Sequence, residues 1–169
     1  MRYWLGLGAN LGDRRAALEA ALAWLSGAGV AVEAVSPAYE TAPRDVVDQP
    51  AFMNAAVRVA TDLPPEDLLR TVKELERELG REPGPRRGPR AIDCDLLLWD
   101  GGAHDAGDLL TIPHPRLAER RFALLPVLDL DPGLALPDGR RLADLLAAIP
   151  PGDQPARRLE EPLTVPELD

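Results

Sequence analysis

Apolar and polar residues alternate along four segments of the chain, and apolar residues recur at helical spacing in two others. The alternating segments predict strands over residues 3–8, 30–39, 52–61 and 92–99. The helical spacing predicts helices over residues 12–26 and 64–79, the second with prolines and acidic residues in its first turn. The order strand, helix, strand, strand, helix, strand is that of a ferredoxin-like βαββαβ core, an α+β fold with an antiparallel sheet. Pro37 in the second strand indicates an edge or a bulge.

The last third of the chain is less regular. The pattern of apolar residues predicts two short helices, over residues 122–130 and 140–149. Prolines and acidic residues are frequent in residues 151–169, and we expect such a segment to be loose or to lie along the surface. Because the chain has 169 residues and no interdomain linker, we expect one domain over residues 1–150, followed by this acidic, proline-rich C-terminal tail.

Two aspartates one residue apart mark the fourth predicted strand. Successive side chains of a strand point to opposite sides of the sheet, so Asp93 and Asp95 share one side. The apolar side, which we expect to face the helices, carries Ile92, Cys94, Leu96 and Leu98. Magnesium commonly uses one or two carboxylates together with substrate phosphates. The pair is therefore a candidate metal site, and a solvated face or an arginine-paired couple is the alternative.

Four arginines precede this strand in a segment rich in glycine and proline: Arg81, Arg86, Arg87 and Arg90. A metal held by acidic residues, with arginines that bind phosphates, is the usual charge arrangement for phosphoryl transfer. Ordinary surface ion pairs are the alternative for these arginines.

The third predicted strand carries a candidate site for a flat heterocycle. Phe52 and Asn54 lie on the same side of this strand, where a ring can stack and an amide can both donate and accept hydrogen bonds. Phe122 could supply the opposite wall of this site. A core position is the alternative for Phe52, because an aromatic residue on a strand is often part of the core. Gly6 and Gly8 share one side of the first strand, and such glycines often mark a close approach by backbone or ligand. We therefore expect the helices on one face of the sheet and the active site on the other.

Histidines and composition narrow the function further. His114 lies between two prolines, with arginines following, and could donate to a phosphate; a structural role is the alternative. His104 is expected to be solvated. A net charge of −9 disfavours nucleic-acid binding, and the single lysine, Lys73, excludes a Gly-Lys-Ser/Thr phosphate loop. Without a long apolar run or a signal peptide, and with only Cys94 as a thiol, we expect a cytoplasmic protein that contacts no membrane.

Several blocks of the sequence are similar, in chain order, to those of a known family. They are residues 5–12 (LGLGANLG), 39–43 (YETAP), 48–57 (DQPAFMNAAV), 76–81 (ERELGR), 88–95 (GPRAIDCD), 112–117 (IPHPRL) and 120–122 (RRF). The combination of the Gly-Pro-Arg-x-x-Asp-x-Asp block with the Phe-x-Asn-Ala-Ala and Pro-His blocks is highly specific. Over about residues 3–148, the chain resembles the 6-hydroxymethyl-7,8-dihydropterin pyrophosphokinases of folate biosynthesis.

The resemblance implies an enzyme that transfers diphosphate from ATP to the hydroxymethyl group of the pterin and releases AMP. It implies two Mg²⁺ ions per active site, held by Asp93 and Asp95, and catalytic roles for Arg81, Arg90 and Asp95. The implied pterin-binding residues are Thr41, Ala42, Pro43, Phe52, Asn54 and Phe122. The implied ATP-binding residues are Lys73, Glu76, Arg81, Arg90, Leu96, Thr111, His114 and Arg120. ATP and the pterin are the expected partners of a protein that we expect to be a monomer.

The chain departs from the family's usual pattern in the arginine-rich segment. Arg87 stands where tryptophan is often found, Pro83 stands where a basic residue is common, and the segment is one residue short. Closure of this segment over the site, and the affinity for the nucleotide, could therefore differ from the family's.

Two other functions fit the residues. A ferredoxin-like module could bind a nucleotide or metabolite without catalysis, and it would not need both Asp93 and Asp95. A metal-dependent nucleotide hydrolase would use water in place of the pterin. The products formed from ATP, with and without the pterin, distinguish these functions.

Overall fold

The computed structural model describes residues 1–42, 51–80, 92–150 and 152–165. The centre of this described part is an antiparallel sheet of six strands. The strands are β1 (Arg2–Ala9), β2 (Ala31–Val35), β3 (Tyr39–Thr41), β4 (Phe52–Ala60), β5 (Asp93–Trp99) and β8 (Ala156–Arg158). They are arranged in the order β5-β1-β4-β3-β8, and β2 pairs with the second half of β4.

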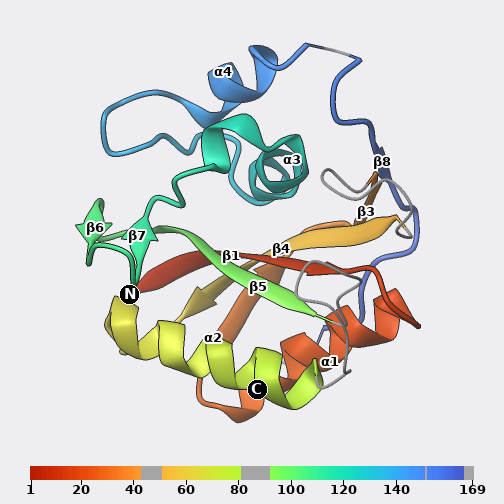
Figure 1. Ribbon diagram of the computed structural model, residues 1–169, viewed down its shortest axis with the longest axis vertical. Helices are drawn as coiled ribbons and strands as arrows, with labels where there is room; N and C mark the ends of the chain where they lie inside the picture. The colour runs from red at the N-terminus through yellow and green to blue at the C-terminus, as the bar shows by residue number, and fades with distance from the viewer. Residues whose placement is uncertain (43–50, 81–91, 151, 166–169) are drawn as a thin grey trace.

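Helices lie on both faces of the sheet (Figure 1). The helices of the first face are α1 (Arg14–Gly27) and α2 (Pro65–Leu79). The opposite face carries the 3-10 helix η1 (Leu117–Glu119), α3 (Arg121–Leu130) and α4 (Leu142–Ala147). The face that we expected to be left for the active site is therefore partly covered by α3, which packs mainly against β4.

Alternation along the strands divides the apolar side chains into two clusters. Leu5 and Leu7 of β1 join the core under α1 and α2, whereas Trp4 joins the cluster around α3. The predicted faces are confirmed for β1 and β4. The prediction is wrong for Leu98 of β5, which belongs to the α3 cluster. The pairing of β1 with β5 shifts register between Trp4 and Leu5, and such a bulge changes which side the following residues face.

The segment predicted as one strand over residues 30–39 is divided into β2 and β3 at Pro37, which has no N–H to donate. Ser36 maintains the contact with β4 at this break. Its hydroxyl accepts a hydrogen bond from the Ala56 N–H at 2.8 Å, and its own N–H donates to the Ala56 carbonyl at 2.9 Å. Ser36 is only 2% exposed, so its hydroxyl stands where water has little access.

The C-terminal tail supplies a strand that the sequence pattern did not predict. Residues 156–158 form β8 at the edge of the sheet, beside β3. Leu163, further along the tail, is buried in the core under α1 and α2. These residues of the tail are therefore part of the packed structure.

A two-stranded ribbon of β6 (His104–Asp105) and β7 (Thr111–Ile112) follows β5. His104 was expected to be solvated, but its Nε2 lies 2.6 Å from Glu66 and its ring meets Trp99 edge-on. Within the described ranges, every helix is too short or too polar to span a bilayer.

Replacing Ser36 with alanine tests the junction between β2 and β3. The variant leaves the buried N–H of Ala56 without its acceptor, and an unpaired buried group of this kind costs about 1–3 kcal/mol. We expect the free energy of unfolding, measured by urea denaturation, to fall by that amount. Ser26→Ala is the matched control, because Ser26 is exposed at the end of α1 and its loss should cost less than about 0.5 kcal/mol. Equal effects of the two substitutions would contradict the role of Ser36.

Candidate active site

Three neighbouring strands bring predicted site residues into one row across the sheet. Gly8 of β1 is paired with Asp93 of β5 on one side and with Asn54 of β4 on the other. Tyr39 of β3 continues the row beyond Asn54. Directly paired residues have their Cβ atoms about 4.5–5.5 Å apart and point to the same face. The row therefore places a carboxylate, an amide and a phenol on the face of the sheet that carries α3.

Glycine in β1 provides space within this row. A Cβ atom on Gly8 would lie 2.7 Å from Oδ1 of Asn54, closer than non-bonded atoms approach. A Cβ atom on Gly6, which is paired with Asp95, would lie 3.2 Å from Cδ1 of Leu97. Side chains of the neighbouring strands therefore closely approach the backbone of β1 at Gly6 and Gly8, as expected for glycines in a strand.

The predicted pterin-binding residues of β3 and β4 contact one another. Nδ2 of Asn54 donates a hydrogen bond to the Thr41 hydroxyl at 2.6 Å, and both residues are buried. Thr41 is paired with Phe52, so its side chain shares the face of the row. Phe52 is half-buried, and Ala42, the residue after Thr41, is exposed. The strands thus present a fixed amide beside an aromatic ring.

The beginning of α3 supplies a second aromatic ring on the same side of the sheet. Phe122 lies in the first turn of α3, and the Arg120 guanidinium lies 5.5 Å from the centroid of its ring, a cation–π contact. Both Phe122 and Phe52 are only half-buried, which leaves aromatic surface for a ligand. The two walls of the candidate pterin site therefore come from different elements.

Asp93 and Asp95 begin β5 and form a candidate metal site. The residue between them, Cys94, is buried in the core under α1 and α2, so both carboxylates lie on the opposite face. Both aspartates are half-buried. In the described part of the chain, no group of three or more His, Cys, Asp or Glu could hold a metal ion. Two carboxylates fit magnesium, which keeps water ligands and takes further oxygens from phosphates.

Helix α2 covers part of the edge of β5. Oε2 of Glu76 accepts a hydrogen bond from the Cys94 N–H at 3.0 Å, and Oε1 lies 3.2 Å from Nζ of Lys73. Burial raises the pKa of Glu76, although both contacts act to lower it. Burial also raises the pKa of the Cys94 thiol well above its ordinary value, so this cysteine is a poor nucleophile. Lys73 and Glu76 therefore lie beside the strand that carries both aspartates.

The chain returns to β5 after the ribbon and places His114 there. The His114 N–H donates to the Leu97 carbonyl at 2.9 Å, and Nδ1 of its ring accepts from the Arg116 N–H at 3.1 Å. An Nδ1 that accepts a hydrogen bond leaves the proton of the neutral ring on Nε2. Burial lowers the pKa of His114, and the charges of Arg120 and Arg116 lower it further. The neutral ring can therefore donate one hydrogen bond from Nε2.

Some predicted residues do not join this group. The side chain of Leu96 is 4% exposed in the core under α1 and α2, so only its backbone can contribute to a site on the other face. Thr111 lies in β7, where its hydroxyl donates to the Gly107 carbonyl at 3.4 Å. The predicted residues outside the described ranges are Pro43, Arg81 and Arg90.

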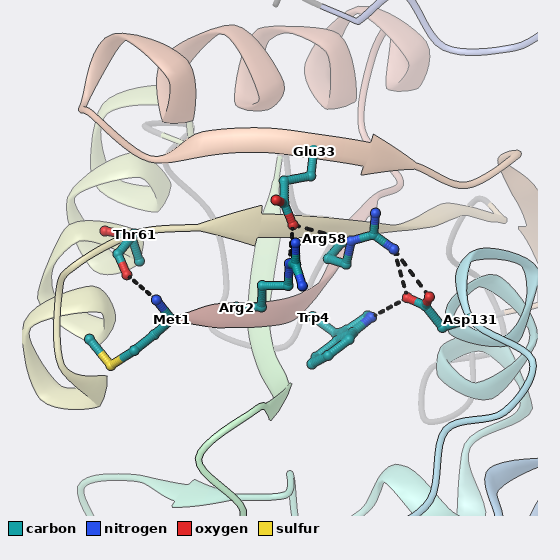
Figure 2. Close-up of polar contacts among 7 residues, drawn as sticks. All are labelled: Met1, Arg2, Trp4, Glu33, Arg58, Thr61 and Asp131. Carbon is teal, nitrogen blue, oxygen red and sulfur yellow. Dashed lines mark hydrogen bonds and ion pairs between the residues drawn. The ribbon is translucent and has the colours of Figure 1, made fainter.

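Sequence reasoning missed the residues that hold α3 on the sheet. Asp129, near the end of α3, accepts a hydrogen bond from the Tyr39 hydroxyl. Asp131, the residue after α3, accepts from Nε1 of Trp4 at 2.7 Å and from Arg58 at 3.1 Å (Figure 2). Acidic groups at the C-terminal end of a helix oppose its dipole. This departure from helix preference is the signal that could have indicated partners on the sheet.

The chain is similar to known proteins over most of its length. Residues 4–132 match the family model described as 7,8-dihydro-6-hydroxymethylpterin-pyrophosphokinase (HPPK). The 2-amino-4-hydroxy-6-hydroxymethyldihydropteridine pyrophosphokinase of Pseudomonas aeruginosa is 41% identical over 150 residues, which cover 88% of this chain and 92% of the relative. The mitochondrial folate synthesis bifunctional protein of Arabidopsis thaliana is 46% identical over 126 residues, which cover 75% of this chain and 23% of the relative. The chain thus spans about a quarter of that plant protein.

A solved structure shows the same fold. The HPPK-DHPS protein of Plasmodium falciparum superimposes with a TM-score of 0.68 at 15% identity, over 86% of this chain and 45% of that chain. The match to the family model spans β1 from Trp4 onward with its glycines, Phe52, Asn54, both aspartates and the whole of α3. The chain therefore belongs to the 7,8-dihydro-6-hydroxymethylpterin-pyrophosphokinase family.

Proposed function

We propose that the protein transfers diphosphate from ATP to the hydroxymethyl group of 6-hydroxymethyl-7,8-dihydropterin and releases AMP. Membership of the HPPK family supports this activity. The observation that carries the proposal is the row in which Asp93 and Asn54 flank Gly8 on one face of the sheet. Two strand spacings, about 10 Å, separate the candidate phosphate and metal site from the candidate heterocycle site. That distance suits transfer between two substrates bound side by side.

The pterin would lie between the rings of Phe52 and Phe122, which offer partly exposed aromatic surface on the same side of the sheet. Asn54 would read its hydrogen-bonding edge. Because Nδ2 of Asn54 already donates to Thr41, the amide is held in one orientation before the ligand binds. Backbone groups of Thr41, Ala42 and Pro43 would complete the recognition of the pterin.

ATP would lie along β5. Lys73 and Glu76 border this strand from α2, and neutral His114 could donate from Nε2 to a phosphate. Arg81, Arg90 and Arg120 would supply positive charge, while Thr111 and the backbone of Leu96 would border the nucleotide. Arginine suits this role because its planar fork matches phosphate oxygens.

The reaction needs positioning more than covalent participation by the protein. The pterin hydroxyl oxygen would attack the β-phosphorus of ATP, and the bond from that phosphorus to the oxygen shared with the α-phosphorus would break. AMP would leave with the shared oxygen, and the hydroxyl proton would pass to solvent. Magnesium bound by Asp93 and Asp95 would neutralise phosphate charge and lower the pKa of the hydroxyl. Asp95 would also orient the hydroxyl proton.

The proposal has finer features as well. The family resemblance implies two magnesium ions per site and closure of the segment 81–90, and we expect a monomer. The order of the elements predicts a ferredoxin-like core, and length and composition predict a domain over 1–150, a tail over 151–169 and a cytoplasmic location. The strand order β5-β1-β4, with β2 and β3 beyond β4, supports the ferredoxin-like arrangement. The segment 81–90 lies outside the described residues.

The products formed from ATP test the proposed function. The protein is incubated with ATP, magnesium and the pterin, and the nucleotides are separated by chromatography. We expect AMP and the pterin diphosphate in equal amounts, and no AMP when the pterin is left out. AMP formed without the pterin, or ADP with phosphate, would indicate a hydrolase. Tight binding of ATP without turnover would indicate a non-catalytic module.

Asp93→Asn and Asp95→Asn test the metal assignment in the same assay. Each variant removes a charged ligand but keeps its size, and we expect turnover to fall by a factor on the order of 100 or more. Stability should hold or rise, because the two carboxylates no longer repel each other. Asp100→Asn, at an exposed position directly after β5, is the matched control and should keep its activity. Turnover near that of the unaltered protein in either site variant would reject the assignment.

His114 should contribute a pH dependence to stability. The fold lowers the pKa of this histidine below its ordinary value of 6.5, so the unfolded chain binds the proton first as the pH falls. The stability that comes from neutral His114 is therefore present above about pH 6.5 and is lost as the pH falls toward the folded pKa. His114→Asn cannot titrate, so urea denaturation across this range should show a weaker pH dependence for the variant. Parallel curves for the two proteins would contradict this.

A further inference from the structure

The C-terminal tail contacts the beginning of α3 through one side chain. Oε1 of Gln154 accepts a hydrogen bond from the Arg121 N–H at 2.9 Å, and Nε2 of Gln154 donates to the Glu119 carbonyl at 2.8 Å. Arg120, the N-cap residue directly before α3, makes no side-chain hydrogen bond that caps this end of the helix. The first N–H groups of a helix have no partner within it, so Gln154 supplies from the tail an acceptor that the helix's own N-cap does not.

The backbone of Gln154 is unusual as well. Its φ of +52° is the left-handed conformation, and no other non-glycine residue in the described ranges has a positive φ. Side chains with a Cβ atom rarely adopt this conformation, because it is sterically unfavourable. The two hydrogen bonds of the side chain offset this cost, which indicates that the side chain holds the backbone in place.

The tail then runs directly along β3. Ala156 is paired with Thr41, and Arg158 is paired with Tyr39. Arg158 also contacts Asp129 near the far end of α3. Residues 154–158, which we name the strap, therefore join α3 to the strand that carries Thr41.

The strap also lies beside two of the candidate pterin-binding residues, Thr41 and Ala42. A cavity of about 300 Å³ at this edge of the sheet is lined by Glu40, Thr41, Ala42 and Ala51 and, from the strap, by Pro155, Ala156 and Arg157. At its other end, Gln154 holds the turn of α3 that carries Phe122. The strap thus touches both the strand and the helix between which the pterin would bind.

We propose that the strap is a positioning element of the pterin site and that Gln154 is its positioning residue. By fixing the first turn of α3 relative to β3, Gln154 sets the distance between Phe122 and the pterin-binding residues of β3 and β4. The proposal rests on the proposed function. Because β8 and β5 are at opposite edges of the sheet, the strap should affect the pterin and leave ATP, which would lie along β5, nearly unchanged.

The far end of α3 is held independently of Gln154. Asp131 is bound by Trp4 and Arg58, and Arg58 also lies 3.2 Å from Glu33 of β2 (Figure 2). Loss of Gln154 should therefore loosen the first turn of α3 without releasing the helix from the sheet.

Gln154→Ala and Gln154→Gly test the proposal in the full chain. Alanine keeps the unfavourable φ, whereas glycine adopts it freely, so a defect common to both variants belongs to the lost hydrogen bonds and not to backbone strain. We expect faster amide hydrogen exchange in residues 121–123, and a KM for the pterin raised about threefold to thirtyfold. The KM for ATP should change less than about twofold. Gln154→Glu keeps an acceptor for the Arg121 N–H and should recover most of the pterin affinity.

A second anchor of the same tail provides the matched control. Nη1 of Arg15 in α1 donates to the Pro162 carbonyl at 3.0 Å, so Arg15→Ala loosens the tail away from α3 and should leave both KM values unchanged. Phe122→Ala gives the effect of removing the aromatic wall of the pterin site. It should raise the KM for the pterin at least as much as either Gln154 variant.

Four outcomes would overturn the proposal. Unchanged exchange in residues 121–123 would show that Gln154 does not hold this turn. Faster exchange with unchanged pterin affinity would reject the positioning role while leaving the proposed function intact, and so would an equal loss of affinity for ATP and the pterin. An unaltered protein that binds no pterin at all would reject both proposals.

Discussion

The register of β1 between β4 and β5 is the constraint on which the candidate site depends. Leu5 and Leu7 of β1 are buried in the core under α1 and α2, and their burial opposes any slip of the strand. A slip of one residue would move every side chain of a strand to the other face. Since this register pairs Gly8 with both Asp93 and Asn54, the same packing that stabilises the core also aligns an acidic residue with an amide on the opposite face.

The faces of β1, β4 and most of β5 could be predicted because alternation is a local property with a period of two. Pro37 was interpreted as an edge or a bulge of one strand, whereas in the structure it separates two strands, β2 and β3. Leu98 was assigned wrongly because a bulge depends on the partner strand, which the local pattern does not include. The partly buried His104 was missed for a similar reason, since its partner Glu66 lies on α2.

Site residues could be predicted only where the residue type and the periodicity of a single strand or helix were informative together. Asp93, Asn54 and Phe52 combine a strand period with an informative residue type, so they could be singled out. Gln154 carries no such signal, and Asp129 carries only that of an acidic residue near the C-terminal end of a helix. Their roles exist only once α3, β3 and the tail have been packed together.

The two edges of the sheet are completed in different ways, and the difference matches the division proposed for the two substrates. At one edge the chain adds its own strand, β8. At the other, the Cys94 N–H and the Leu97 carbonyl of β5 are satisfied by Glu76 and by the backbone of His114. Both are residues expected to border ATP. An unpaired edge strand invites association with other chains, so the same residues that protect β5 would also shape the nucleotide site. Loss of the Glu76 carboxylate would therefore leave the Cys94 N–H without its acceptor and disturb the placement of both aspartates, whereas the bond from His114 comes from its backbone and persists when its side chain is replaced.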